Sequence, residues 1–219
     1  ITKEQEELAR SFEAFCQEKI APRSMQADKE SAIPDESWKD LAEMGFFRLP
    51  FPEEAGGLGG DWVVQAMAEE SLAKACASTF LSTGASIGLC GGPLFHYVSD
   101  EQKERWLAPM MAGEKIVCFG LTEPGAGTDV KNMKSRAKKT DDGWVLSGEK
   151  ALITTAPVAD VAVVMAVTDP EAGYGGVTAF AVDLSKEGVS RTEPYSKMGL
   201  RASTTGGLVF DEVQLDDGD

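Results

Sequence analysis

The sequence predicts an α+β fold: an all-α helical N-terminal domain over residues 1–113, followed by a mostly antiparallel, β-barrel-like middle domain over residues 114–219. Two observations support this prediction. Apolar residues recur at helical spacing up to about residue 113 and in short strand-like runs afterwards. These runs are separated by glycine-containing turns and do not alternate with helical segments, so a parallel Rossmann sheet is disfavoured. A chain of 219 residues is long enough for two modest domains.

The helical part begins with a capping box at Thr2. The first helix is expected to stop at Ala21, because Pro22 cannot continue it. A short helix opens at Pro34 and ends before Gly45, a natural C-terminal cap. Further helices are predicted for residues 61–75, 78–90 and 99–111.

The second part begins with an apolar run at residues 116–121. Asp142-Gly143 is a hairpin signal between the runs 136–140 and 144–146. Further strand-like runs cover residues 161–168, 177–184 and 208–213.

Composition narrows the class of protein and its partners. Hydrophobic residues make up 42% and charged residues 26%, values typical of an ordinary globular chain. No stretch approaches the ~18 consecutive apolar residues of a membrane helix, so no membrane span is expected. The formal net charge is −15, which repels phosphate backbones, so no nucleic acid partner is expected.

The cysteines and the single histidine do not form a recognisable metal-binding pattern. The cysteines form no C-x-x-C pair, so we expect buried thiols in a reducing compartment. His96 is the only histidine, and a core or surface role is favoured over a catalytic one. The four cysteines are Cys16, Cys76, Cys90 and Cys118.

The chemistry lies in residues 118–130. The turn at residues 124–127 can gather backbone N–H groups into a nest for an anion such as phosphate, and Thr122 and Thr128 flank it with hydroxyls. A dinucleotide fingerprint is absent, because Val130 occupies its sixth position and no βαβ unit surrounds it. On these residues alone, a plain strand-to-loop turn is the favoured interpretation.

Several motifs together resemble the acyl-CoA dehydrogenase family. The first is Leu121-Thr-Glu-Pro-Gly-Ala-Gly-Thr-Asp129, and the second is Ser147-Gly-Glu-Lys-Ala-Leu-Ile-Thr154. The third is Lys197-Met-Gly-Leu-Arg-Ala-Ser-Thr-Thr205. With Gly56-Gly-Leu-Gly59 in the helical part, the similarity covers nearly all of residues 1–213.

The resemblance implies a third, C-terminal four-helix domain beyond the two found here, so the chain is expected to be a fragment or one subunit of a split enzyme. It implies FAD as cofactor, acyl-CoA as substrate and electron-transfer flavoprotein as electron acceptor. A homo-oligomer (tetramer or dimer) is also implied, in the bacterial cytoplasm or the mitochondrial matrix.

Site residues follow from the matched motifs. Thr128 would lie near both FAD and the acyl-CoA, and Thr154 would donate a hydrogen bond to flavin N5. Leu152 departs from most members of the family, which place an aromatic residue there, often Trp. Glu123 and Asp129 are interpreted as turn-capping residues rather than catalytic acids. The implied FAD-binding residues are Phe119, Gly120, Leu121, Thr122, Gly127, Thr128, Leu152, Ile153 and Thr154.

The implied reaction is FAD-dependent α,β-dehydrogenation of an acyl-CoA thioester to the 2-enoyl-CoA. The family's catalytic base is a carboxylate on the C-terminal domain, so no catalytic residue is expected in this chain. Phe80 stands where a relative that acts on a dicarboxylic thioester carries an arginine, which favours a neutral acyl group. The alternatives are an acyl-CoA oxidase and a non-catalytic subunit of a split dehydrogenase; oxygen consumption distinguishes the oxidase.

Overall fold

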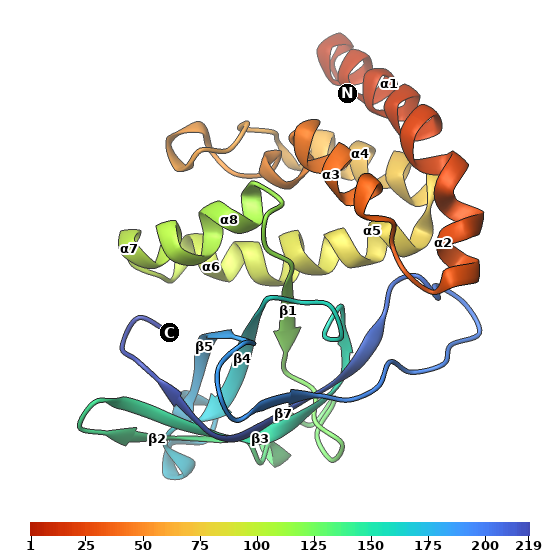
Figure 1. Ribbon diagram of the computed structural model, residues 1–219. Coiled ribbons are helices and arrows are strands. Elements are labelled where there is room, and N and C mark those ends of the chain that lie inside the picture. Colours follow the sequence, from red (N-terminus) through yellow and green to blue (C-terminus); the bar gives the residue numbers. More distant parts are fainter.

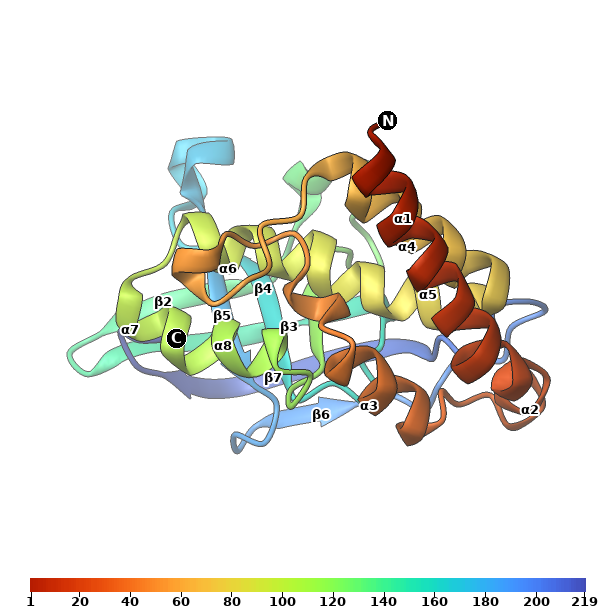
Figure 2. The ribbon, with the colours of Figure 1, turned by 90° about the horizontal axis from the view of Figure 1, so that it is seen from above.

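The computed structural model describes residues 1–219, apart from the side chain of Tyr174. Figure 1 shows a layer of helices above a curled mixed sheet, with strand β1 (Val117–Gly120) descending from the helices into the sheet. Seen from above, the helices lie over the strands (Figure 2). This arrangement confirms the predicted α+β fold.

Most helices of the upper layer begin close to the predicted positions, although the helical segment predicted for residues 78–90 continues to His96. Capping boxes form at Thr2 and Ser99, and Asp61 caps its helix through the N–H groups of residues 63 and 64. Gly45 follows its helix with φ 82°, a left-handed conformation that glycine adopts without strain. The α-helices are α1 (Lys3–Phe15), α2 (Ser24–Glu30), α3 (Asp35–Glu43), α4 (Trp62–Ala75), α5 (Ala77–Gly84), α6 (Gly92–His96), α7 (Asp100–Gln102) and α8 (Ala108–Met111).

The expected stop at Ala21 is wrong, because the helical path continues past Pro22 to α2. A π-helical turn, η1 (Cys16–Ile20), directly follows α1, and the Ala21 N–H donates to the Cys16 carbonyl five residues back. A 3₁₀ turn, η2 (Ala21–Arg23), then holds the proline near its start. The proline's missing N–H therefore falls where the α-helical hydrogen-bond ladder is already interrupted.

The sheet contains the predicted strands and one short strand that the sequence did not reveal, β6 (Val189–Arg191). Neighbouring strands run in the order β1-β4-β2-β3-β7-β6, with β5 beside β4. Most pairs are antiparallel, whereas β1 and β2 each pair with β4 in parallel. The remaining strands are β2 (Arg136–Thr140), β3 (Gly143–Thr154), β4 (Val161–Val167), β5 (Val177–Asp183) and β7 (Thr205–Leu215).

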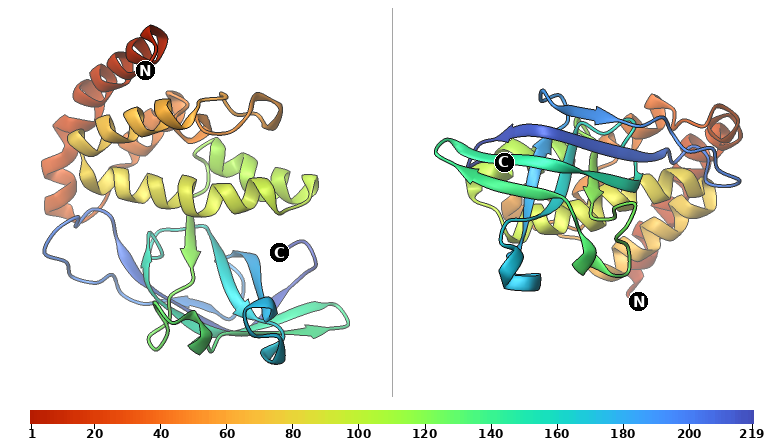
Figure 3. Two further views of the ribbon diagram at one scale, coloured as in Figure 1. Left: turned by 180° about the vertical axis from the view of Figure 1, so that it is seen from behind. Right: turned by 90° about the horizontal axis from the view of Figure 1, so that it is seen from below.

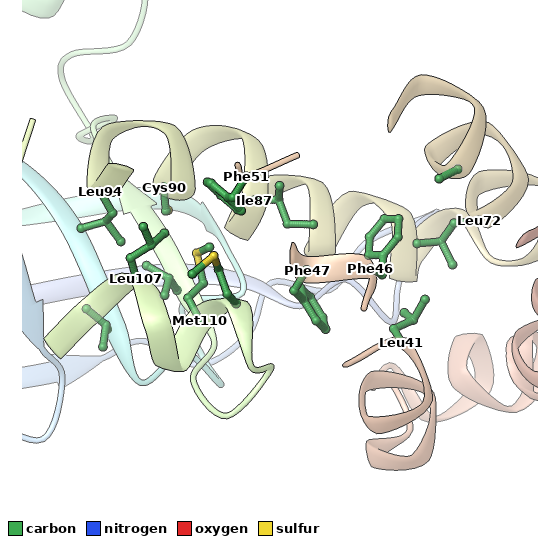
Figure 4. Close-up of a cluster of buried hydrophobic side chains, with 14 of the residues drawn as sticks. Leu41, Phe46, Phe47, Phe51, Leu72, Ile87, Cys90, Leu94, Leu107 and Met110 are labelled. Carbon is green, nitrogen blue, oxygen red and sulfur yellow. The ribbon is translucent and has the colours of Figure 1, made fainter. Parts of the chain in front are cut away.

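Two hydrophobic clusters form the core. The larger packs the helices together and reaches Val117 and Val161 on the sheet; many of its members, among them Phe46, Phe47 and Met110, are labelled in Figure 4. The smaller lies within the curled sheet. Because the larger cluster includes residues from both layers, the helices and the sheet share a continuous core.

The long helical segment α5–α6 is fixed directly to β1. A π-helical stretch, η5 (Ala85–Gly91), joins α5 to α6, and its buried Ser86 hydroxyl donates to the Val117 carbonyl at 2.8 Å. The rear view in Figure 3 shows β1 crossing from this helix toward the sheet. The Ser86 bond thereby fixes the start of β1 to the helix layer, and the other end of β1 leads into the candidate site.

Among the described residues, no helix is long and apolar enough to cross a membrane.

Candidate functional site

The loop after β1 lies against the end of β3. The Ala151 N–H donates to the Thr122 carbonyl at 2.9 Å, so the two segments that share the family motifs are neighbours. Gly120 lies at the crossing point, where an added Cβ would stand 3.4 Å from the Lys150 Cγ. Folding therefore brings together two motifs that lie apart in the sequence.

A β-bulge sets which side chains of β3 face outward. Lys150 pairs with Leu208 on β7, and Ile153 pairs with Gly206. Between these two pairs, β3 advances by three residues while β7 advances by two, so β3 carries one extra residue. Leu152 lies in the bulge with φ 59°, in the left-handed region. In a regular strand, residues 150 and 152 would share one face. Here Lys150 and Ile153 are both buried while Leu152 is 66% exposed.

Behind this surface, Lys150 and Glu123 form a buried ion pair. The Lys150 Nζ lies 2.8 Å from the Glu123 Oε1 and also donates to the Leu121 carbonyl at 3.2 Å. The other Glu123 oxygen accepts the Lys134 N–H at 2.6 Å, and Oε1 also accepts the Ser135 N–H at 3.0 Å. The carboxylate thus joins three segments of the chain.

The pKa values of this pair reflect burial and hydrogen bonding. Burial raises the pKa of Glu123, but hydrogen bonds from Lys150 and from residues 134–135 outweigh it, so the pKa lies below its ordinary value of 4.5. Burial lowers the pKa of Lys150, and the Glu123 carboxylate opposes that effect. A carboxylate that is buried, ion-paired and accepts three hydrogen bonds is a poor general base.

The turn of the first motif is closed by its own backbone. Glu123 and Ala126 exchange backbone hydrogen bonds of 2.8 and 3.2 Å. Asp129 accepts the Lys131 N–H at 3.2 Å and the Asn132 side chain at 2.7 Å. Both acids therefore stabilise the loop, as turn-capping residues do. Gly125 and Gly127 have no atoms within 4 Å of an added Cβ, so the outer side of the turn is open.

The hydroxyls of Thr122, Thr128 and Thr154 have no hydrogen-bond partner within the described part of the chain. Thr122 and Thr154 are half-buried, and Thr128 is exposed. The chain therefore offers three uncommitted hydroxyls on the two adjoining segments. These groups are suited to a ligand with polar edges.

Other expected site residues point inward. Ile153 is 3% exposed and belongs to the sheet core. Phe119 packs against the helical core, and Gly120 is buried. Lys150 was not singled out from the sequence, because nothing local marks a lysine on a strand as buried; only its distance to Glu123 reveals its role.

A cavity of about 700 Å³ lies beyond Thr154, between the helices and the sheet. It is lined by residues of both layers, including Trp38, Ser82, Thr155, Val158 and Thr204. None of the nine FAD-binding residues implied by the resemblance lines it. The cavity and the motif surface are thus adjacent but separate features.

The fold combines a helical layer, a curled sheet and two adjoining motif segments. Comparison with known proteins identifies the family that shares this arrangement. The acyl-CoA dehydrogenase N-terminal domain profile matches residues 2–114, and the middle domain profile matches residues 118–213. Together the two profiles cover most of the chain. The chain therefore belongs to the acyl-CoA dehydrogenase family.

Similar proteins agree with this assignment. The chain is 37% identical over 216 residues to the probable acyl-CoA dehydrogenase YngJ of Bacillus subtilis, covering 98% of this chain and 57% of that protein. The butyryl-CoA dehydrogenase of Megasphaera elsdenii superposes with a TM-score of 0.93 at 34% identity, covering 100% of this chain and 58% of that one. A structure described as PigA with FAD and proline gives a TM-score of 0.95 at 28% identity, with coverages of 100% and 58%. The chain thus spans little more than half the length of these relatives.

Proposed function

We propose that this chain forms the FAD-binding portion of an acyl-CoA dehydrogenase, which converts an acyl-CoA thioester to the 2-enoyl-CoA. The observation that carries the proposal is the contact of the two motif segments through the Ala151 N–H and the Thr122 carbonyl, 2.9 Å apart. This contact brings together the two segments that carry the uncommitted hydroxyls of Thr122 and Thr154. Family membership and the relatives above support the same function.

The residues present fit an isoalloxazine ring. Such a ring has apolar faces and one edge of nitrogen and oxygen atoms, which needs hydrogen-bond donors. Thr122 supplies a hydroxyl and a backbone N–H that no acceptor occupies in the described part of the chain. Thr154 supplies a second hydroxyl, and Leu152 offers an exposed apolar side chain on the same strand. We therefore assign these three residues, with Leu121, to the ring.

The remaining implied residues have supporting roles. We assign Gly127 and Thr128 to the phosphate-bearing part of FAD, and Thr128 also to the acyl-CoA, because the turn there is open. Gly120 and Ile153 act through backbone position, since both are buried. Phe119 anchors the end of β1 to the helical core.

The cofactor supplies the hydride acceptor when bound. This chain's own part is to hold the ring edge and to exclude water from its inner side. We assign no catalytic base to the chain: Glu123 is committed to Lys150, and Glu149 is exposed on the strand. A base must come within hydrogen-bonding reach of the proton that it removes. We therefore propose that the carboxylate base is contributed from outside these residues.

The proposed substrate, partners and cellular location are those that the family resemblance implies. We propose a neutral acyl group, electron-transfer flavoprotein as acceptor and a homo-oligomer, in the bacterial cytoplasm or the mitochondrial matrix. We also propose that residues 1–113 and 114–219 are the two domains. The helical and the sheet elements meet near this boundary, because α8 ends at Met111 and β1 begins at Val117.

Titration with FAD tests the proposal. Purified protein should quench or shift the flavin fluorescence saturably, and Thr154→Val should weaken the binding. Thr140→Val, at the exposed end of β2, is a matched control that should not change it. Absence of saturable FAD binding by the wild-type protein would overturn the proposed function.

A further inference from the structure

The ion pair of Lys150 and Glu123 lies directly behind the surface assigned to FAD, and the proposed function does not use its charge. The two side chains are 0% and 5% exposed. Breaking a buried ion pair leaves one charge without compensation, and an apolar pair of similar volume is often at least as stable. Stability alone is therefore a weak reason for charged groups at this place.

The contacts of Lys150 suggest a more specific role. Its ammonium donates to the Leu121 carbonyl at 3.2 Å. That carbonyl belongs to the same peptide unit as the Thr122 N–H. A cation on the carbonyl side polarises the unit and makes its N–H a stronger donor. In the described part of the chain this N–H has no acceptor, so it is available to a ligand.

The next peptide unit is held at both ends. The Thr122 carbonyl accepts the Ala151 N–H at 2.9 Å, and the Glu123 N–H donates to the Ala126 carbonyl at 2.8 Å. The Glu123 carboxylate meanwhile holds the Lys150 ammonium at 2.8 Å. The orientation of the Leu121–Thr122 peptide is thereby determined from β3 and from the turn together.

We propose that Lys150, held by Glu123, is a positioning residue that orients and polarises the Leu121–Thr122 peptide toward the polar edge of the flavin ring. This inference rests on the proposed FAD binding. The ring edge becomes more negative on reduction, so a stronger donor stabilises the reduced cofactor more than the oxidised one. Lys150 therefore raises the reduction potential of the bound flavin as well as its affinity.

Four variants of the FAD-loaded protein test the role. Lys150→Met removes the charge, and Lys150→Arg keeps it. Glu123→Gln with Lys150→Met removes both charges, so that no uncompensated buried charge threatens folding. Lys138→Met, at an exposed position on β2, is the matched control. The readouts are the FAD dissociation constant, the flavin absorption spectrum and the reduction potential.

We expect Lys150→Met to weaken FAD binding by about tenfold, the size of effect seen when residues that orient metal ligands are removed, and to make the reduction potential more negative. Lys150→Arg should stay close to wild type in potential. The double variant should be more stable than Lys150→Met, but its flavin reduction potential should remain more negative than that of the wild type. If it folds while Lys150→Met does not, it alone decides the question.

Three results would overturn the inference while FAD binding by the wild-type protein stands. The first is a wild-type potential and affinity in Lys150→Met. The second is the same outcome in the double variant. The third is an arginine variant that behaves like the methionine variant. If the wild-type protein fails to bind FAD, the proposed function fails first, and this inference fails with it.

Discussion

Ser82 on α5 donates a hydrogen bond to the hydroxyl of Ser203, before β7, at 2.9 Å. Both side chains are fully buried. The bond joins the helical layer to the loop of the third family motif, across 121 residues of sequence. It is one of the polar contacts that fix the sheet beneath the helices.

We expect Ser82→Ala to lower the free energy of unfolding by about 1–3 kcal/mol, because the buried Ser203 hydroxyl loses its partner. Urea unfolding measures the change. Ser82→Ala with Ser203→Ala should cost less than the sum of the single changes, since neither hydroxyl is then left unpaired. Ser190→Ala, at an exposed position on β6, should have little effect. Additive costs would show that the bond does not couple the two layers.

The free energy of unfolding should depend on pH through the ionisation of Glu123. Its pKa is lower in the folded protein than its ordinary value of 4.5. A lowered carboxyl pKa contributes stability that is fully present above the unfolded-state pKa and is lost as the pH falls through the folded-state pKa. The difference in unfolding free energy between wild type and Glu123→Gln should therefore shrink as the pH falls below about 5.

Urea unfolding between about pH 3 and pH 7 measures this difference directly. Glu149→Gln provides the control, because Glu149 lies next to Lys150 on β3 but is exposed. Its difference from wild type should be small throughout. A Glu123→Gln difference that is independent of pH would contradict the prediction.

Leu152 should tolerate glycine better than a regular strand position does. Its φ of 59° lies in the left-handed region, which costs a non-glycine residue roughly 1–2 kcal/mol. Leu152→Gly relieves that cost and gives up little packing, since the side chain is 66% exposed. Val145→Gly, earlier on β3, should be less stable than Leu152→Gly by about 1 kcal/mol or more. Thermal unfolding without FAD compares the two; equal losses would refute the relief of strain.

Leu152→Trp should leave FAD bound and change its spectrum or potential. The substitution adds an aromatic face beside the proposed ring position, and aromatic contacts contribute about 0.5–1.5 kcal/mol beyond area burial. Absorption spectroscopy and potentiometry of the loaded protein measure the effect. Val158→Trp, at another exposed apolar position past the end of β3, is the control. An unchanged spectrum and occupancy would mean that residue 152 does not face the ring.

The acyl substrate should be neutral. No Lys or Arg occurs from Ala75 to Gln102, and the cations that flank this stretch are already paired. Lys74 lies 2.9 Å from Glu70, and Lys103 lies 3.0 Å from Asp100. A far carboxylate on the acyl group would then be buried without a partner, which is costly.

Turnover of a panel of CoA esters by the FAD-loaded protein, combined with the polypeptide that contributes the proposed base, checks the prediction. Butyryl-CoA and branched-chain esters should be oxidised, and glutaryl-CoA should not. Efficient oxidation of glutaryl-CoA with the neutral esters inert would contradict it.

The sequence by itself determined the local features and the family. Capping boxes at Thr2 and Ser99 and the hairpin at Asp142-Gly143 act over a few residues, so their signals are complete within short segments. The order of helices and strands and the motif set indicated the acyl-CoA dehydrogenase family before any geometry was known.

Tertiary structure alone decided which motif residues reach the surface. Lys150 is buried because it meets Glu123, 27 residues away in sequence, and Leu152 is exposed because a bulge shifts β3 against β7. Pro22 is tolerated because a π-turn opens the helix ahead of it. Each outcome depends on partners brought close by folding, and the free energy of such contacts is not encoded in the neighbouring residues. Strand alternation alone would have placed Lys150 and Leu152 on the same face.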